Sequence, residues 1–169
     1  MGKYYLEDRI SVKYRDISPY LIQALVATED KRFYDHYGID GEGLVRAVAF
    51  LGSKGGASTI SMQTAKNLFT NNWGTKNKLL RVIQKIKESI IAIKLERNFT
   101  KQEILTLYLN TVPFSDNLFG VSNASRTFFQ KEPDRLSVEE AALLIGMINA
   151  PTKYNPNRNP KLALERRNL

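Results

Sequence analysis

Two adjacent carboxylates, Glu29 and Asp30, directly follow an apolar run and are the first residues whose setting suggests chemistry. The run consists of Leu21, Ile22, Ala24, Leu25, Val26 and Ala27. Withdrawal from water raises the pKa of a carboxyl group in general, which makes a glutamate a useful proton acceptor or donor near neutral pH. The simpler interpretation is a pair of solvated charges that mark the end of a helix. These two residues alone leave both interpretations open.

A third carboxylate, Glu88, lies on a predicted helix from Leu79 to Arg97, on the same face as Arg81 and Lys85. The apolar stripe of this helix consists of Leu79, Val82, Ile83, Ile86, Ile90 and Ile93. Ile91 and Leu95 flank the side of Glu88. We therefore expect the helix to be buried on more than one side and Glu88 to be partly desolvated. The alternative is a Lys85–Glu88 surface ion pair worth about 0.3 kcal/mol.

Composition limits the function classes. The chain has 169 residues, 43% of them hydrophobic, which suits one folded domain with a real core. A net charge of +8 favours an anionic partner such as nucleic acid, anionic lipid headgroups or a phosphorylated substrate. The chain has no cysteine and only one histidine, which excludes disulfides, thiolate nucleophiles and histidine clusters. Any metal would need mainly carboxylate and phosphate oxygen ligands.

The two ends of the sequence suggest a domain excised from a longer protein. No run of about 18 apolar residues could span a bilayer, and Met1-Gly2-Lys3 does not open a secretory signal. A helical pattern that starts at Lys161 is still running at Leu169. We therefore expect residues 1–169 to form one domain excised from a longer protein, a boundary that would hide any upstream membrane anchor.

Helical spacing and capping signals predict a mainly α, single-domain fold with few strand patterns. Capping boxes are predicted at Thr100 with Glu103 and at Ser137 with Glu140, and Ser18 is expected to cap the first helix. The other predicted helices are Pro19–Glu29, Gly43–Leu51, one from Ser58 or Thr59 through Leu68, Val121–Phe129 and Ala141–Ile148. Loops are predicted at Phe33–Gly43, Phe69–Asn77 and Asp116–Gly120, and Trp73 in the second is either packed or an interfacial anchor.

Five segments in order resemble the motifs of the peptidoglycan glycosyltransferases, glycosyltransferase family 51. They are E-D-K-R-F-Y-D-H-Y-G from Glu29, G-A-S-T-I-S-M-Q from Gly56, K-I-K-E from Lys85, E-I-L-T-L-Y-L-N from Glu103 and F-G-V-S-N-A-S-R-T-F-F from Phe119. Each motif alone is weak, but five in order at compatible spacings are specific. The resemblance covers nearly the whole chain, from about Tyr14 onward.

The resemblance implies a lysozyme-like helical fold that polymerises lipid II on the outer face of the bacterial cytoplasmic membrane. The growing glycan strand is the donor, lipid II is the acceptor, and the product bond is β-1,4 with inversion and release of undecaprenyl pyrophosphate. Glu29 falls on the general base of the family and Glu88 on its second essential glutamate. The substrate-binding residues implied by the motifs and by the need for cations are Arg46, Ser58, Thr59, Gln63, Lys66, Lys85 and Lys87. Asp30, Phe33 and His36 are expected to support the loop around Glu29.

Several partners follow from the same resemblance. An anionic membrane surface and phosphate-bearing substrates would account for the positive charge, and no nucleic-acid partner is expected. Mg²⁺ or another divalent cation is a candidate cofactor, bound by Glu88 together with the substrate pyrophosphate, and no organic cofactor is expected. The parent protein could also carry a C-terminal transpeptidase domain.

Three positions depart from the family pattern: Met62 where glutamine is common, Gln84 where arginine is common and Thr106 where glutamate is common. Gln84 cannot make the bidentate phosphate contact that an arginine would make. Arg81, one turn earlier, could make this contact in place of an arginine at position 84. Met62 replaces a hydrogen-bonding side chain with an adaptable apolar one. Two alternative functions stay open: a lysozyme-like hydrolase or lytic enzyme acting on finished glycan, and a non-catalytic basic module that binds membrane or nucleic acid.

Overall fold

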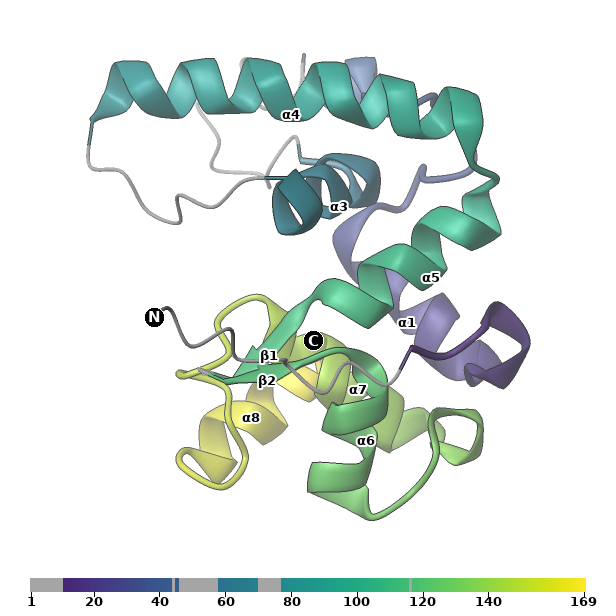
Figure 1. The fold of residues 1–169 in the computed structure, drawn as a ribbon. Helices are drawn as coiled ribbons and strands as arrows, with labels where there is room; N and C mark the ends of the chain where they lie inside the picture. The colour runs from purple at the N-terminus through teal and green to yellow at the C-terminus, as the bar shows by residue number, and fades with distance from the viewer. Residues whose placement is uncertain (1–10, 44, 46–57, 70–76, 116) are drawn as a thin grey trace, which may run out of the picture.

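The computed structural model describes residues 11–43, 45, 58–69, 77–115 and 117–169, and it is mainly helical (Figure 1). In chain order its elements are η1 (Tyr14–Asp16), α1 (Pro19–Glu29), α3 (Ile60–Phe69), α4 (Lys78–Asn98), α5 (Lys101–Thr111), β1 (Pro113–Ser115), β2 (Leu118–Phe119), α6 (Val121–Phe129), η2 (Pro133–Arg135), α7 (Val138–Ile148) and α8 (Pro160–Arg167). The mainly α fold predicted from the sequence is confirmed.

Local capping signals set most helix boundaries. Thr100 with Glu103 and Ser137 with Glu140 both form complete capping boxes, as predicted. The side chain of Asn77 accepts a hydrogen bond from the Leu79 N–H and caps α4. Ser18 occupies the N-cap position of α1, as predicted, although its side chain makes no capping hydrogen bond. Its buried hydroxyl instead donates to the carbonyl of Leu136, 3.1 Å away.

The helices form an upper and a lower group in the view of Figure 1. In the upper group α4 lies along the top with α3 packed beneath it, and α3 also packs on α5. Helix α5 runs down into the lower group, where α1 packs on α7 and α7 packs on α8. The buried core includes Leu21 and Leu25 of α1, Ile104 and Leu109 of α5, and Leu144 of α7. This core fixes the end of α1, and therefore Glu29, relative to α5.

A short antiparallel pair, β1 with β2, replaces the irregular loop predicted around Asp116–Gly120. The pairing joins Pro113 to Phe119 and Ser115 to Leu118, with an irregularity between the two pairs. Strands this short carry too few residues for an alternating apolar pattern, so periodicity could not reveal them. Gly120 follows at φ 78°, and a Cβ there would meet the carbonyl oxygen of Asn110 at 2.9 Å, so this turn requires glycine.

The prediction that α4 is buried on more than one side is wrong. All residues of its apolar stripe except the half-buried Ile93 are exposed, Leu79 by 68% and Ile86 by 55%. The buried face of the helix carries Glu88, Ala92 and Leu95 instead, at helical spacing. The partial desolvation predicted for Glu88 is confirmed, since the residue is 5% exposed. Helix α3 packs on α4, and the described part of the chain leaves the opposite stripe uncovered.

Some predictions fall on residues outside the described ranges. These are Arg46, Trp73, the glycine-rich run Gly52–Gly56 and most of the helix Gly43–Leu51. Residues 41–43 and 45 are helical, which agrees with the predicted start of that helix to within two residues.

Candidate active site

Glu29 is the last residue of α1, and its half-buried side chain faces α3. The side-chain amide of Gln63, on α3, donates a hydrogen bond from Nε2 to Glu29 Oε2 at 3.0 Å. The amide oxygen Oε1 of Gln63 accepts a hydrogen bond from the hydroxyl of Tyr108, on α5, at 3.1 Å. Three helices therefore meet at Glu29 through side chains far apart in the sequence.

Asp30 stands next to Glu29 but has different surroundings. The chain leaves the helix at Asp30, whose φ of −158° is extended. Its buried carboxylate accepts hydrogen bonds from His36 Nε2 at 2.9 Å and from the backbone N–H of Ile60 at 3.0 Å. The N–H of Gly38 donates to His36 Nδ1 at 3.2 Å, which assigns the ring proton to Nε2. Asp30 therefore ties the loop after α1 to the start of α3.

Phe33 and Lys101 complete the support of this loop. Phe33 is fully buried, and the Lys101 ammonium lies 4.4 Å from the centre of its ring. The same ammonium donates to the His36 carbonyl at 2.6 Å and pairs with Glu96 at 2.8 Å. The supporting positions predicted for Asp30, Phe33 and His36 agree with these contacts.

A second group of side chains surrounds Glu88. The Lys85 ammonium lies 2.9 Å from Glu88 Oε2 and donates to Ser58 Oγ at 2.6 Å. The close approach to Glu88 is an ion pair without hydrogen-bond geometry, so Oε2 is buried with no hydrogen-bond partner among the described residues. The pair is not the surface pair of the alternative interpretation, because the Lys85 side chain is 51% exposed while that of Glu88 is only 6% exposed. A carboxylate buried in this way is stabilised mainly by the neighbouring cation.

One cleft of about 340 Å³ brings many of these groups together. One wall carries Glu29, Ser58, Gln63, Lys66, Asn67 and Lys85. The opposite wall comes from the end of α5, from β1 and from the end of α7, and consists of Val112, Pro113, Ile148, Asn149 and Pro151. The cleft therefore presents one carboxylate, two cations and several amide and hydroxyl groups to a bound molecule.

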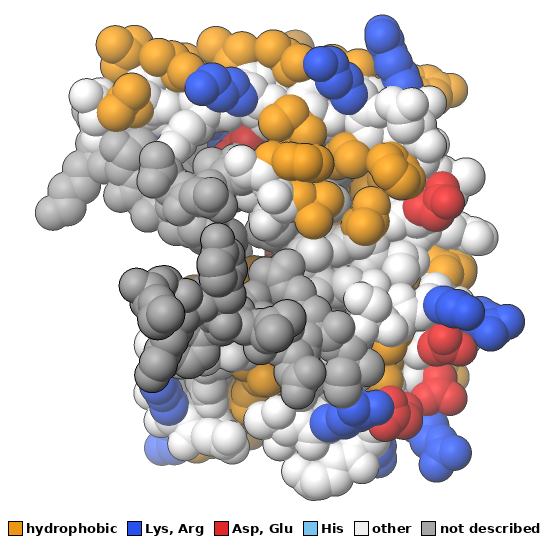
Figure 2. Space-filling model, viewed as in Figure 1, with side chains coloured by type: hydrophobic (Ala, Val, Ile, Leu, Met, Phe, Trp, Pro, Cys, Tyr) orange, Lys and Arg blue, Asp and Glu red, His pale blue; other side chains and the backbone are white. Residues whose placement is uncertain are grey.

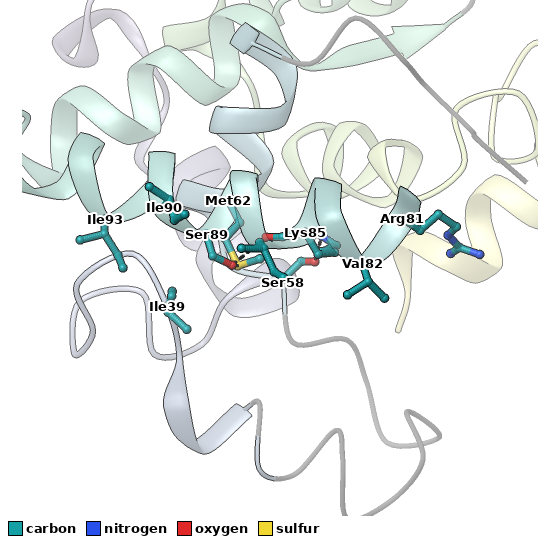
Figure 3. Close-up of a pocket in the computed structure, with 10 residues that line it drawn as sticks. Ile39, Ser58, Met62, Arg81, Val82, Lys85, Ser89, Ile90 and Ile93 are labelled. Carbon is teal, nitrogen blue, oxygen red and sulfur yellow. Dashed lines mark hydrogen bonds between the residues drawn. The ribbon is translucent and has the colours of Figure 1, made fainter. Parts of the chain in front are cut away.

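A larger apolar groove of about 740 Å³ adjoins the cleft (Figure 3). Its walls are Ile39 on one side, Met62 between the helices, and the α4 side chains Val82, Ile86, Ile90 and Ile93. Ser58 and Lys85 line both the groove and the cleft, so the two are continuous. Arg81 lies at the end of the groove beyond Lys85 (Figure 3).

Comparison with known proteins identifies the family. A family model described as Transglycosylase matches residues 1–169. Penicillin-binding protein 1A of Aquifex aeolicus is 43% identical over 97% of this chain, penicillin-binding protein 1A of Escherichia coli is 38% identical over 100%, and penicillin-binding protein 1F of Bacillus subtilis is 40% identical over 96%. The alignments cover 22%, 20% and 22% of these relatives, so the chain spans about a fifth of their length.

This chain belongs to the transglycosylase family. The prediction of a peptidoglycan glycosyltransferase enzyme is confirmed at the level of the family. The cleft beside Glu29 is therefore the candidate active site of a transglycosylase.

The predicted site residues are distributed unevenly. The cleft brings together Glu29, Ser58, Gln63, Lys66 and Lys85, while Glu88 adjoins it through its ion pair with Lys85. Thr59 is buried instead of lining the cleft, because its hydroxyl donates to the Gly38 carbonyl at 2.6 Å and accepts from the Met62 N–H. Lys87 is exposed and lines neither the cleft nor the groove.

Sequence reasoning missed two amides of the transglycosylase cleft, Asn67 and Asn149. The Nδ2 of Asn67 is buried without a hydrogen-bond partner among the described residues. Asn149 follows α7, and its place in the sequence indicates only the end of this helix. The position of Asn67 one turn after Gln63 was the available signal, because residues four apart share a helix face.

Proposed function

We propose that this domain polymerises lipid II into β-1,4-linked glycan, with the growing strand as donor and undecaprenyl pyrophosphate as leaving group. The observation that carries the proposal is the single cleft holding the Glu29 carboxylate together with the ammonium groups of Lys66 and Lys85. A sugar hydroxyl needs a base to become a nucleophile, and a departing pyrophosphate needs preorganised cations. A hydrolase acting on finished glycan would have no use for those cations.

In the proposed reaction, Glu29 removes the proton from the 4-hydroxyl of the lipid II GlcNAc as its oxygen attacks the anomeric carbon of the donor. The bond from that carbon to the pyrophosphate breaks on the opposite face, which inverts the configuration. Lys85 and Lys66 stabilise the negative charge that develops on the leaving group. Glu88 and Ser58 hold the Lys85 ammonium where the cleft meets the groove. Glu88 therefore acts through Lys85 in this proposal.

The apolar groove would receive the prenyl chain of the lipid-linked substrate. Its length along α4, its apolar side chains and its continuity with the cleft at Lys85 suit a chain that ends in a pyrophosphate. Met62, one of the departures from the family pattern, is buried in its wall with Sδ 3.9 Å from Ser89 Oγ. Arg81 lies in the groove one turn before Lys85 and could bind the phosphate in place of the arginine that is common at position 84.

The exposed stripe of α4 supports a membrane location. Hydrophobic side chains gather over α4 at the top of the molecule, with Lys and Arg side chains among them (Figure 2). Such a surface suits the interface of an anionic membrane. Within the described residues, no helix is both long and apolar enough to cross a bilayer. We place the domain against the outer face of the cytoplasmic membrane, and its membership of a longer anchored protein stays a prediction.

The divalent cation stays a prediction. The described residues contain no group of three or more His, Cys, Asp or Glu side chains able to hold a metal ion. Among them, Glu88 offers a carboxylate near the proposed pyrophosphate position, and Lys85 already pairs with it. These residues do not fit a resident metal, so the proposed reaction relies on the lysines. A cation such as Mg²⁺ could bind only together with substrate oxygens.

The test is a lipid II polymerisation assay with wild type, Glu29→Gln, Glu88→Gln and Gln84→Arg. We expect Glu29→Gln to lower kcat at least about 100-fold, because general base catalysis typically contributes that much. Glu88→Gln should also lower activity, while Gln84→Arg should raise it. Glu165→Gln, an exposed carboxylate change on α8, is the control. Unchanged activity in Glu29→Gln would overturn the mechanism, and shortening of finished glycan without lipid II consumption would favour a hydrolase.

A further inference from the structure

The hydrogen-bond chain from Tyr108 through Gln63 to Glu29 crosses from the buried core to the cleft. Tyr108 is fully buried on α5 and does not line the cleft, whereas Gln63 and Glu29 do. The hydroxyl of Tyr108 therefore touches neither substrate nor solvent, and its hydrogen bond in the described structure goes to Gln63 Oε1 at 3.1 Å.

The direction of these hydrogen bonds follows from elementary chemistry. An ionised carboxylate accepts hydrogen bonds and cannot donate one, so the amide group that faces Glu29 has to be the NH₂ group of Gln63. The amide oxygen then faces Tyr108, whose hydroxyl has to donate. The two ends of a glutamine amide have nearly the same shape, so packing alone does not choose between them.

We propose that Tyr108 is a positioning residue for the transglycosylase base, because it fixes the side-chain amide of Gln63 with its NH₂ group toward Glu29. This inference rests on the proposed role of Glu29. Gln63, which the sequence predicts to contact the donor substrate, then holds Glu29 Oε2 instead. This leaves Glu29 Oε1 for the acceptor hydroxyl.

The electrostatics of Tyr108 agree with a permanent donor. Burial raises the pKa of Tyr108 well above its usual value, and the nearby charge of Glu29 raises the pKa further. The hydroxyl therefore keeps its proton at any working pH. The position of Gln63 is also fixed from the backbone, since its N–H donates to the Thr59 carbonyl at 3.0 Å in the first turn of α3.

The central test is Tyr108→Phe in the full chain, with lipid II polymerisation measured from pH 5 to 9. The phenyl ring keeps the packing, and only the hydroxyl is removed. We expect kcat to fall about 3- to 10-fold, the effect of removing one oriented hydrogen bond, with KM little changed. The acidic limb of the pH profile should move to higher pH, because the ionised form of the base loses support. Tyr154→Phe, a half-buried tyrosine packed on the core, is the matched control and should behave as wild type.

A second variant separates this role from simple packing. Gln63→Met keeps the length of the side chain and removes both ends of the amide, so it should shift the acidic limb in the same direction. Because Tyr108 acts through Gln63, adding Tyr108→Phe to Gln63→Met should produce no further shift. If Tyr108→Phe does not fold, the pH profile of Gln63→Met still tests the positioning role. An unshifted acidic limb in Gln63→Met overturns the inference.

The outcomes distinguish this inference from the proposed function. Wild-type kcat and pH profile in Tyr108→Phe, with an inactive Glu29→Gln, overturn the positioning role alone. Independent, multiplying losses in the double variant also overturn it. An active Glu29→Gln overturns the proposed function itself.

Discussion

Replacing Asp30 tests the division between a supporting carboxylate and its catalytic neighbour. In Asp30→Ala, two buried donors are left without their acceptor: His36 Nε2–H, now 2.9 Å from the carboxylate, and the Ile60 N–H, now 3.0 Å away. A buried donor left without a partner costs about 1–3 kcal/mol, so the pair should cost about 2–6 kcal/mol. For a chain of this length, the corresponding decrease in Tm is about 5–20 °C.

The assay is urea and thermal unfolding of Asp30→Ala, Asp30→Asn and wild type. Asp30→Asn should cost less than Asp30→Ala, because its amide oxygen can still accept while its charge is gone. Asp35→Ala removes an exposed carboxylate from the same loop and should stay within about 0.5 kcal/mol of wild type. If Asp30→Ala proved as stable as Asp35→Ala, the reasoning from buried donors would be refuted. Glu29→Gln should retain nearly full stability and lose activity, the reverse pattern.

Three further predictions concern the fold and the groove. Gly38→Ala should destabilise the domain by about 1–3 kcal/mol in urea unfolding, because φ is 95° and the new Cβ would lie 2.8 Å from the backbone of Ala92. Glu140→Gln should lose stability in urea unfolding at pH 7, and the loss should shrink steadily as the pH falls below 4.5. The Lys131 hydrogen bond lowers the pKa of Glu140 against opposing desolvation, so the contribution of Glu140 is present above the usual value of 4.5 and lost as pH falls through the lowered pKa. Ile90→Asp puts a charge in the groove wall at a 50%-exposed position, so it should raise KM about tenfold for a long-chain prenyl substrate and much less for a short-chain analogue. Equal KM effects on both substrates would contradict the assigned groove.

Features that depend on near neighbours in the sequence could be predicted. The capping boxes at Thr100 and Ser137 place their helix starts, because caps act within four residues. The bounds of α6 agree with the prediction at both ends. Glu29 and Asp30 could be placed at the end of α1 for the same reason. Their different surroundings could not, because the partners of Asp30 come from His36 and from Ile60, 30 residues away.

Features that depend on tertiary packing could not be predicted in the same way. The stripe of α4 has the pattern of a buried face, and only the arrangement of α3 beneath the other face shows that it is exposed. The hydrogen bond between Tyr108 and Gln63 joins residues 45 apart, which no spacing rule covers. The family motif predicts that Thr59 lines the cleft. In the structure, the Thr59 hydroxyl instead bonds to the Gly38 carbonyl and to the Met62 N–H at the start of α3. The motif therefore mixes residues that build the site with residues that line it.

The two faces of α4 together account for the position of the proposed reaction. One face buries Glu88 and holds Lys85 through it, while the opposite stripe leaves large apolar side chains exposed, such as Leu79 at 68%. A large apolar side chain left in water forgoes about 1.5–3 kcal/mol of burial free energy, so a stripe of several such residues strongly favours contact with an apolar phase. Lys85 stands where that stripe meets the cleft. In the proposed reaction, the apolar tail of the substrate would contact the stripe and its pyrophosphate would contact Lys85, which would leave the reacting sugar in the cleft beside Glu29.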